Sequence, residues 1–414
     1  MKTYLVGGAV RDKLLGKQPH DKDYVVVGST VSDMLNLGFQ QVGKEFPVFL
    51  HPETNEEYAL ARKERKSGDK HTDFTFEFSP DVTLEDDLVR RDFTINAMAL
   101  DDNEIVYDYF NGQEDLKNKL LKAVRPETFV EDPLRVLRGA RFAAQLDFDV
   151  EEKTMSLFKD MVKKGMLEHL TAERVWKETE KALTKGFNSV KYFEVLNECG
   201  ALEVLMPELH RLVNTPEQVK YHPSGNTFKH TMIALERVKN EDSLIKFMVA
   251  CHDLGKGVTP EDILPKHNGH DERGLGQIDL LCDRLKAPNE YREKAKTFCK
   301  FHMRMARFTE MNLKKQYDMV KDLSNGFKDE QTLEDFIKCF YADWTGENEQ
   351  TAWNDVNVFY KIVDVMRKVF WVMCKKTLKD LPKEVQERLK KFKGADFGKQ
   401  YRDEMIHYLR THLS

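Results

Sequence analysis

Two acidic residues near the N-terminus, Asp21 and Asp23, are separated by one residue. Side chains alternate between the faces of a β-strand, so on a strand both carboxylates would share one face. Carboxylate oxygens suit Mg²⁺, and a two-metal site can activate a hydroxyl group and stabilise a leaving pyrophosphate. Because solvated strand edges also carry such pairs, the two aspartates do not establish a metal site alone.

A double glycine, Gly7 and Gly8, precedes this acidic pair and lies where a strand would pass into a helix. Glycine allows backbone N–H groups to approach a phosphate closely, and a helix N-terminus adds positive potential. Arg11 would project from the first helical turn toward the same phosphates. A third carboxylate is expected on the strand EYALARKER, where Glu56, Glu57 and Glu64 all remain candidates.

Further chemistry is concentrated in the segments RRDFTINAMAL and EDPLRVLRGARFAAQL. In the second segment a helix would place four residues in an i, i+3 row opposite an apolar face: Asp132, Arg135, Arg138 and Arg141. An acceptor on Asp132 beside a donor on Arg135 matches cytosine and adenine, which present an amino group beside a ring-nitrogen acceptor, and mismatches uracil and guanine. A solvated, salt-bridged arginine face is the alternative.

The stretch CHDLGKG places His252 beside Asp253 at the end of an apolar helical run. Adjacent His and Asp can share one metal if further imidazoles approach from elsewhere. The candidates for the remaining ligands are His230, His270, His302 and Asp343, while His267 is as readily structural.

The elements that position these residues fall into two classes. Short strands at 3–6, 24–27, 47–50 and 58–61 alternate with helices at 10–15 and 31–37, which predicts a compact α/β unit. After residues 108–116 nearly all patterns are helical and amphipathic. Residues 213–227 form the best linker candidate, and residues 257–274 form a loop too rich in histidine to be only a connection.

Composition limits the functional classes. The chain has 414 residues and a net charge of -5, so any nucleic-acid surface must be local. The first 150 residues are acidic and the remainder is slightly basic, including a basic helical tail that is more typical of a solvated face than of an RNA contact. Six widely spaced cysteines and the lack of a long apolar run favour a reduced, cytoplasmic protein without a membrane partner.

Five segments in this order resemble the motifs of bacterial CCA-adding enzymes, which are class II tRNA nucleotidyltransferases: YLVGGAVRDKLLG, DKDYVVVGST, VTLEDDLVRRDFTINAMA, DYFNGQEDL and EDPLRVLRGARFAA. The resemblance extends from residue 1 to about residue 340 and is specific in combination. Lys22 is a departure, since an apolar residue usually separates the acids. CHDLGKG and the later histidines resemble the HD phosphohydrolase domain that some of these enzymes carry.

The resemblance implies an α+β fold with a small polymerase-β-like nucleotidyltransferase head, an all-helical neck and body, and an HD-domain tail. We expect the head at residues 1–125, the neck and body at 126–220, the HD domain at 221–345 and a helical tail at 346–414. It also implies template-independent addition of C, C and A to the 3′ end of tRNA from CTP and ATP.

The family motifs assign roles to matching residues. Asp21 and Asp23 would be catalytic and bind Mg²⁺, while the nucleotide would contact Gly8, Arg11, Arg91, Asp132, Arg135, Arg138 and Arg141. The HD site would hold a divalent transition metal such as Ni²⁺ on His230, His252, Asp253, His270, His302 and Asp343, and would give 2′,3′-cyclic phosphodiesterase, 2′-nucleotidase and phosphatase activities. The expected assembly is a monomer or a homodimer.

Four other functions remain open. A bacterial poly(A) polymerase shares much of the motif set, although the glycines here lie close to the N-terminus without a basic extension. A partial enzyme would add only CC or only A. A hydrolase with a vestigial head, or an RNA-binding protein without catalysis, would not need the acidic pair.

Overall fold

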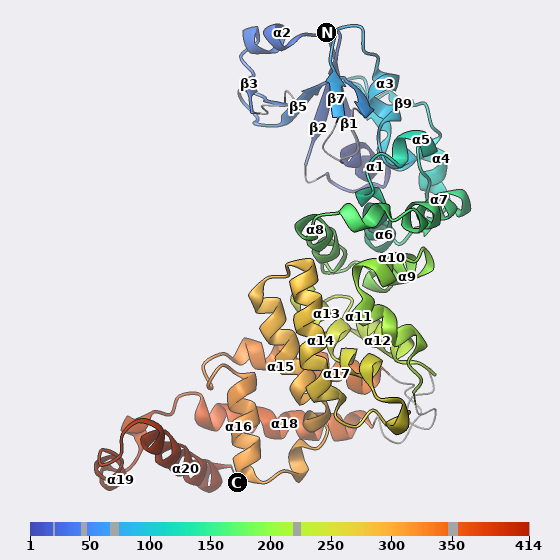
Figure 1. The fold of residues 1–414 in the computed structure, drawn as a ribbon. Coiled ribbons are helices and arrows are strands. Elements are labelled where there is room, and N and C mark those ends of the chain that lie inside the picture. The colour runs from blue at the N-terminus through green and yellow to red at the C-terminus, as the bar shows by residue number, and fades with distance from the viewer. Residues whose placement is uncertain (20, 43–47, 67–73, 218–224, 347–354, 414) are drawn as a thin grey trace. The chain divides into compact units, whose positions relative to one another are not determined.

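The computed structural model describes residues 1–19, 21–42, 48–66, 74–217, 225–346 and 355–413 (Figure 1). The chain forms two compact units. The first contains residues 1–182 and 191–205, and the second contains residues 183–190 and 206–414. The expected division at residues 125, 220 and 345 remains a prediction.

The first unit contains a mixed seven-stranded sheet in the order β3-β4-β5-β2-β1-β8-β9. Its strands, in that order, are Gln40–Gln41, Val48–Leu50, Glu57–Leu60, Asp23–Val27, Lys2–Val6, Met98–Leu100 and Val106–Asp108. A separate hairpin pairs β6 (Lys63–Lys66) with β7 (Phe74–Glu77). The short strands β10 (Leu120–Leu121) and β11 (Asp149–Val150) pair in parallel.

The predicted elements of the first sixty residues are confirmed as β1, β2, β4 and β5 with α1 (Gly8–Leu14) and α2 (Val31–Asn36). Alternating side chains from β1 and β2 enter a buried core that includes Val6, Val25 and Ala99. One prediction was wrong in detail: the β1–β2 ladder ends at the pair Val6 and Asp23, so Asp21 precedes the strand. Both aspartates nevertheless line one cavity.

The first unit contains further helices, of which the first two precede β8 in the chain and the others follow β9. They are α3 (Leu84–Val89), η1 (Thr94–Asn96), α4 (Gly112–Lys117), α5 (Pro126–Phe129), α6 (Leu134–Leu146), α7 (Glu152–Lys163), η2 (Met166–His169), α8 (Ala172–Ala182), α9 (Ser189–Glu198) and α10 (Ala201–Leu205). Helix α6 buries Val136, Leu137 and Ala140 on the apolar face that the sequence predicts. This packing fixes the arginines of its other face.

The described part of the second unit is built from helices. They are α11 (Pro207–His210), η3 (Arg211–Asn214), α12 (Thr227–Arg237), α13 (Ser243–Cys251), η4 (Leu254–Val258), η5 (Glu261–Ile263), α14 (His270–Leu285), α15 (Asn289–Met305), η6 (Phe308–Glu310), α16 (Leu313–Leu323), α17 (Glu330–Thr345), α18 (Val356–Met373), η7 (Leu378–Asp380), α19 (Lys383–Leu389) and α20 (Gly394–His412).

The predicted linker at 213–227 falls partly outside the described residues, at 218–224. Its described ends belong to the second unit: Thr215 and Glu217 are buried, and Pro216 forms a β-bridge with Asn226. These ends are therefore packed structure.

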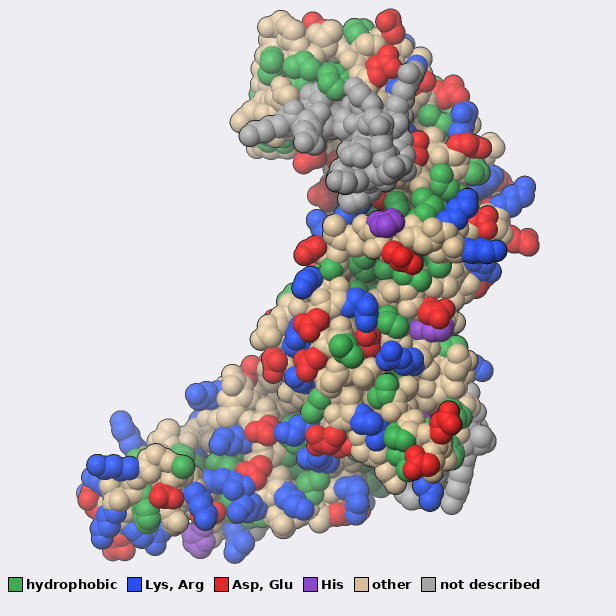
Figure 2. Space-filling view, in the orientation of Figure 1, with side chains coloured by type: hydrophobic (Ala, Val, Ile, Leu, Met, Phe, Trp, Pro, Cys, Tyr) green, Lys and Arg blue, Asp and Glu red, His purple; other side chains and the backbone are tan. Residues whose placement is uncertain are grey.

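Lys and Arg side chains gather over α19 and α20 (Figure 2). Several are paired with acids, as in the contacts of Arg388 with Glu404 and of Lys390 with Glu387. Paired surface charges contribute little to stability and form a solvated face.

Candidate functional site

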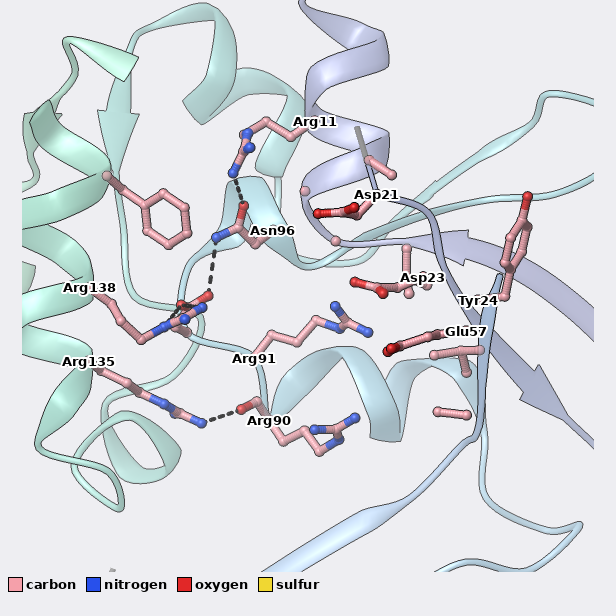
Figure 3. Close-up of a pocket in the computed structure, with 18 of the residues that line it drawn as sticks. Arg11, Asp21, Asp23, Tyr24, Glu57, Arg90, Arg91, Asn96, Arg135 and Arg138 are labelled. Carbon is pink, nitrogen blue, oxygen red and sulfur yellow. Dashed lines mark hydrogen bonds and ion pairs between the residues drawn. The ribbon is translucent and has the colours of Figure 1, made fainter. Parts of the chain in front are cut away.

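A cavity of about 870 Å³ opens in the first unit and brings the predicted nucleotide residues together (Figure 3). Among the residues that the structure describes, eight arginines and six acidic residues line it, and no lysine does. The predicted residues that line it are Gly8, Arg11, Asp21, Asp23, Arg91, Asp132, Arg135, Arg138 and Arg141. Arginine-rich walls suit a polyphosphate.

The double glycine forms the turn between β1 and α1. Gly7 has φ +71°, and a Cβ there would lie 2.9 Å from a guanidinium nitrogen of Arg91. Both facts require glycine. Arg11, one turn into α1, is buried, and its guanidinium donates to Asp12 Oδ1 and to Asn96 Oδ1 at 2.8 Å each.

Three carboxylates lie on one side of the cavity, from Asp21, Asp23 and Glu57 (Figure 3). Glu57 is paired with Asp23 across the parallel β2–β5 ladder. Glu56 instead contacts Lys22, with Nζ 3.1 Å from the carboxylate, so Lys22 is directed away from the acidic pair. Of the two candidates for the third acid whose side chains the structure describes, Glu57 lines the cavity. The side chain of the third candidate, Glu64, lies outside the described residues.

Electrostatics at Asp23 fit a cation site. Burial raises the pKa of the Asp23 carboxyl above its ordinary value, Arg91 lowers it, and Asp21 raises it further. Arg91 is held from the other side by an ion pair with the buried Asp87, at 3.3 Å. Three hard oxygen donors whose charges repel one another suit a Mg²⁺ ion.

Asp132 and Arg135, which are predicted to read the base, both line the cavity but are held by different partners. Asp132 caps the start of α6 through a 3.0 Å hydrogen bond from the N–H of Leu134, and it forms an ion pair with Arg174 at 3.0 Å. Arg135 donates to the backbone carbonyls of Thr128 at 2.7 Å and Arg90 at 2.6 Å.

The other two arginines of the α6 row are also anchored. Arg138 forms an ion pair with Asp92 at 2.6 Å, and Arg141 forms a buried one with Glu178 at 2.5 Å. Their guanidinium carbons lie 5.4 Å and 4.0 Å from the centroid of the Phe142 ring. The row is therefore a fixed wall of the cavity rather than a solvated face.

Two residues of α8 that support the site were not predicted from the sequence. Arg174 and Glu178 hold Asp132 and Arg141, respectively. They lie in ERVWKETEKALTK, an amphipathic segment whose i, i+4 spacing of Arg and Glu is common on helix surfaces and carries no specific signal.

A second cluster lies in the second unit, where six elements contribute the six predicted HD residues. His230 is on α12, His252 follows α13, Asp253 precedes η4, His270 begins α14, His302 is on α15 and Asp343 is on α17. The close approach of η4 to α14 requires Gly255, because a Cβ there would lie 2.0 Å from the carbonyl oxygen of His270. The segment CHDLGKG is thus shaped by packing as well as by charge.

Asp253 is the centre of this cluster. Its Oδ2 is 3.2 Å from Nε2 of His252, and its Oδ1 is 3.3 Å from Nε2 of His270 and 3.6 Å from Nε2 of His302. Asp343 approaches Nε2 of His230 at 3.2 Å. These residues form two groups, and the three possible ligand atoms of each group lie within 4.8 Å of one another. One group is His230, His252 and Asp253, and the other is Asp253, His270 and His302.

The ring nitrogens are arranged for metal binding. Nδ1 atoms of His252, His270 and His302 lie 2.7 to 2.9 Å from carbonyl oxygens three residues earlier, so in neutral rings these atoms carry the proton and Nε2 is an acceptor. Nε2 of His270 then faces Nε2 of His302 at 3.0 Å. Two lone pairs at that distance repel, and a bound cation would relieve the repulsion. The donor set therefore fits a divalent transition metal.

The carboxylates of the cluster favour a positive charge at His252. Burial lowers the pKa of His252, but Asp253 and Asp343 outweigh it and raise the pKa to about 10. A metal ion bound at Nε2 would take the place of this proton. The buried Lys256 bridges Asp253 and Glu217 at 2.9 and 2.8 Å. His267 is structural, since its ring lies 2.8 Å both from Thr259 Oγ1 and from the carbonyl of Pro216.

Comparison with protein families finds two matching segments. Residues 3–122 match the family described as the poly A polymerase head domain. Residues 147–212 match the probable RNA and SrmB-binding site of polymerase A. The first covers the glycines, the three acids and Arg91, whereas the α6 row lies between the two segments and the histidine cluster lies beyond both.

Solved structures match nearly the whole chain. The Bacillus stearothermophilus CCA-adding enzyme in complex with CTP is 22% identical, with a TM-score of 0.63, over 98% of this chain and 87% of the other. A CCA-adding enzyme with ATP is 21% identical, with a TM-score of 0.59 over 99% and 90%. The Thermotoga maritima enzyme complexed with tRNA is 21% identical, with a TM-score of 0.60 over 100% and 92%. The chain has the CCA-adding fold.

Within the CCA-adding fold, the expected architecture is confirmed in its coarser form. A polymerase-β-like nucleotidyltransferase head with a mixed sheet is followed by a mostly helical body. Among the described residues, no helix is both long and apolar enough to cross a membrane.

Proposed function

We propose that this protein is a CCA-adding tRNA nucleotidyltransferase. The observation that carries the proposal is the cavity in which Asp21, Asp23 and Glu57 face an arginine wall, in a head of the CCA-adding fold. Relatives of this fold have been solved with CTP, ATP and tRNA. CTP, ATP and tRNA are accordingly the proposed substrates, and a cytoplasmic location follows from them.

In the proposed reaction, the 3′ hydroxyl of tRNA attacks the α-phosphate of CTP or ATP and pyrophosphate leaves. Asp21 and Asp23, supported by Glu57, would hold Mg²⁺, which supplies Lewis-acid stabilisation of the developing charge. Arg11 and Arg91 contribute fixed positive charge on the phosphate side of the cavity. Their ion pairs keep the guanidinium groups in place before the nucleotide arrives.

Base selection rests on the α6 row. Asp132 presents an acceptor to the amino group of cytosine or adenine, and Arg135 presents a donor to the neighbouring ring nitrogen. Uracil and guanine would instead present a carbonyl to Asp132 and a ring N–H to Arg135, so an acceptor would face an acceptor and a donor would face a donor. Each polar group of the base left without a partner costs roughly 1–3 kcal/mol. The ion pair with Arg174 orients the Asp132 carboxylate for this contact.

The test supplies tRNA that ends at its discriminator base with CTP alone, ATP alone, and both. We expect two additions, none, and three, followed by a stop. Long A tails on unstructured RNA would identify a poly(A) polymerase instead, while arrest at CC with both nucleotides would identify a partial enzyme. A protein that adds nothing and binds tRNA without divalent metal would refute catalysis.

We infer a second activity, metal-dependent phosphohydrolysis, from the histidine cluster. Asp253 directs one oxygen to each group of imidazoles, which favours two metal positions that share its carboxylate. A divalent transition metal such as Ni²⁺ suits these ligands and supplies a nucleophile from bound water at neutral pH. The proposed substrates are 2′,3′-cyclic phosphates, 2′-nucleotides and phosphomonoesters.

The two activities can be separated by mutation. His252→Ala should abolish hydrolysis of 2′,3′-cyclic AMP while CCA addition continues, and Asp21→Ala with Asp23→Ala should do the reverse. Hydrolysis should disappear on chelation and return with Ni²⁺. If one change removes both activities from a well-folded protein, the two-site assignment is wrong. Gel filtration with light scattering distinguishes the two expected assemblies, a monomer and a homodimer.

A further inference from the structure

A continuous line of side-chain hydrogen bonds crosses the cavity from α1 to α6 (Figure 3). Arg11 donates to Oδ1 of Asn96 at 2.8 Å, and Nδ2 of Asn96 donates to Oδ1 of Asp92 at 3.2 Å. Oδ2 of Asp92 then accepts from Nε of Arg138 at 2.7 Å. The phosphate side of the pocket is thus joined to the base side through one amide.

Asn96 has a fixed orientation in this line. An arginine can only donate and an ionised aspartate can only accept, so Oδ1 must face Arg11 and Nδ2 must face Asp92. Burial opposes ionisation of Asp92, but Arg138 outweighs it and keeps its pKa below the ordinary value. Arg11, Asn96 and Asp92 are each about 95% buried, so water does not compete for these bonds.

The chain locks the backbone of Asn96 independently of its side chain. The residue ends the short helix η1, whose first residue, Thr94, donates its hydroxyl to the buried Asp115 at 2.7 Å. The N–H of Thr94 also donates to the carbonyl of Lys122. An exchange of the Asn96 side chain therefore removes the link while η1 stays anchored.

We propose that Asn96 is a positioning residue that couples the phosphate contact of Arg11 to the base-side contact of Arg138. The orientation of each guanidinium then depends on that of the other. A nucleotide with the wrong base therefore also makes a weaker contact through its triphosphate. The proposal rests on the proposed nucleotidyl transfer and adds the link between its two halves. The Asn96 amide is hydrogen-bonded to a charged group on each side, and such charge-assisted bonds restrict the orientation of the amide.

The test compares Asn96→Leu, which keeps the side-chain size and removes both bonds, with Thr154→Val. The control removes a buried hydrogen bond outside the line, from the N–H of Ala123 to Thr154 Oγ1 at 3.0 Å. C addition to tRNA is followed with CTP and with UTP. We expect Asn96→Leu to lower kcat/KM for CTP about 30-fold, mainly through kcat, and to lower the CTP to UTP ratio about tenfold. Thr154→Val should leave both quantities within about twofold of the wild type.

A double-mutant cycle with Arg11→Met and Arg138→Met examines the coupling itself. If the two arginines are coupled through Asn96, the activity lost in the double variant should be at least about fivefold smaller than the product of the two single losses. In the Asn96→Leu background the coupling is absent, so the loss in the double variant should equal the product of the two single losses. Multiplying losses in the wild-type background, or an unchanged CTP to UTP ratio in Asn96→Leu, would overturn the proposal. An inactive wild-type protein would refute the nucleotidyl transfer instead, and binding of CTP by the same variants would still report the coupling.

Discussion

Asp23 and Glu57 are paired in register on the adjacent parallel strands β2 and β5. Neighbouring strands lie about 4.8 Å apart, so the pairing brings two carboxylates to one side of the cavity. Asp21 joins them from the segment that precedes β2. The acidic group is therefore assembled across two strands, and the motif near the N-terminus contains only part of it.

This geometry predicts that changes at Glu57 and Asp23 lower the rate of nucleotide addition, whereas a change at the adjacent Glu56 does not. Glu57→Gln should lower C addition about tenfold and raise the Mg²⁺ concentration needed for half-maximal rate, because an amide is a weaker ligand and leaves the charge of the site less negative. Asp23→Asn should lower the rate at least about 100-fold. Steady-state kinetics over a Mg²⁺ titration measure both.

Glu56→Gln is the matched control for that experiment. Its carboxylate contacts Lys22 instead of the acidic group. We expect a rate within about twofold of the wild type, because an exposed ion pair contributes little. Equal losses in the Glu56 and Glu57 variants would contradict the assignment of the third acid.

Local patterns in the sequence predict most of the head correctly. Period-two runs identify β1, β2, β4 and β5, and the apolar row of EDPLRVLRGARFAAQL identifies the buried face of α6. The partners of α6 lie elsewhere in the chain, since Arg174 and Glu178 come from α8 and Asp92 comes from the segment before η1. Such pairs depend on tertiary packing, which periodicity in one segment cannot report.

The histidine cluster shows the same division. Adjacent His and Asp in CHDLGKG indicate a candidate site, and the resemblance to a known domain assigns it the other four predicted ligands. The buried link from Asp253 through Lys256 to Glu217 was not predicted. Lys256 belongs to the motif itself, but a lysine beside a polar loop more often faces solvent.

Arg174→Met should reduce base discrimination more than catalysis. Asp132 would lose its ion-pair partner at 3.0 Å and with it the contact that orients the carboxylate. We expect the preference for CTP over UTP to fall about tenfold, which corresponds to about 1.4 kcal/mol, while kcat for CTP falls less. Competition between the two nucleotides on one tRNA measures the ratio directly.

Arg174→Lys provides the control for charge alone. It keeps a cation near Asp132 on a flexible side chain that lacks the planar guanidinium. An intermediate selectivity is expected. If both variants select CTP as well as the wild type, Arg174 does not support base reading.

The buried pair of Arg141 and Glu178 predicts a non-additive effect on stability. Arg141→Met or Glu178→Leu alone would leave one buried charge without its partner, at a cost of about 3–5 kcal/mol in the free energy of unfolding. The combination of both changes should cost less than either alone, because no uncompensated charge remains. Urea unfolding of the four proteins, followed by circular dichroism, completes this cycle.

Thiol chemistry offers an independent check of the packing. Five cysteines are buried, and burial raises the pKa of several, including Cys199 to about 11 and Cys282 to about 11. Cys374 is half-buried. A disulfide reagent should therefore modify about one thiol of the native protein at neutral pH and all six after unfolding. Cys374→Ser should abolish the native reaction, and rapid modification of this variant would contradict the described core.

A pH-dependent stability is expected from Lys246, whose ammonium is fully buried and donates to the carbonyls of Thr184 and Phe187 at 2.8 and 3.1 Å. Burial lowers the pKa of Lys246 to about 8 from an ordinary value of 10.5. Between these two values the unfolded chain binds more protons than the folded chain, so this group makes folding more favourable as pH rises. Below about pH 8 the lysine is charged in both states and its burial costs stability.

The measurement is urea unfolding of the wild type and of two variants at pH 7, 8, 9 and 10. Relative to Lys246→Met, which does not titrate, the free energy of unfolding of the wild type should rise on the order of 3 kcal/mol across the full pH interval. Most of this rise should occur between pH 8 and 10. Lys246→Arg keeps its charge throughout and should gain nothing relative to Lys246→Met. Equal slopes for the wild type and Lys246→Met would show that Lys246 remains protonated in the folded protein, since only a group that loses its proton on folding makes stability rise with pH.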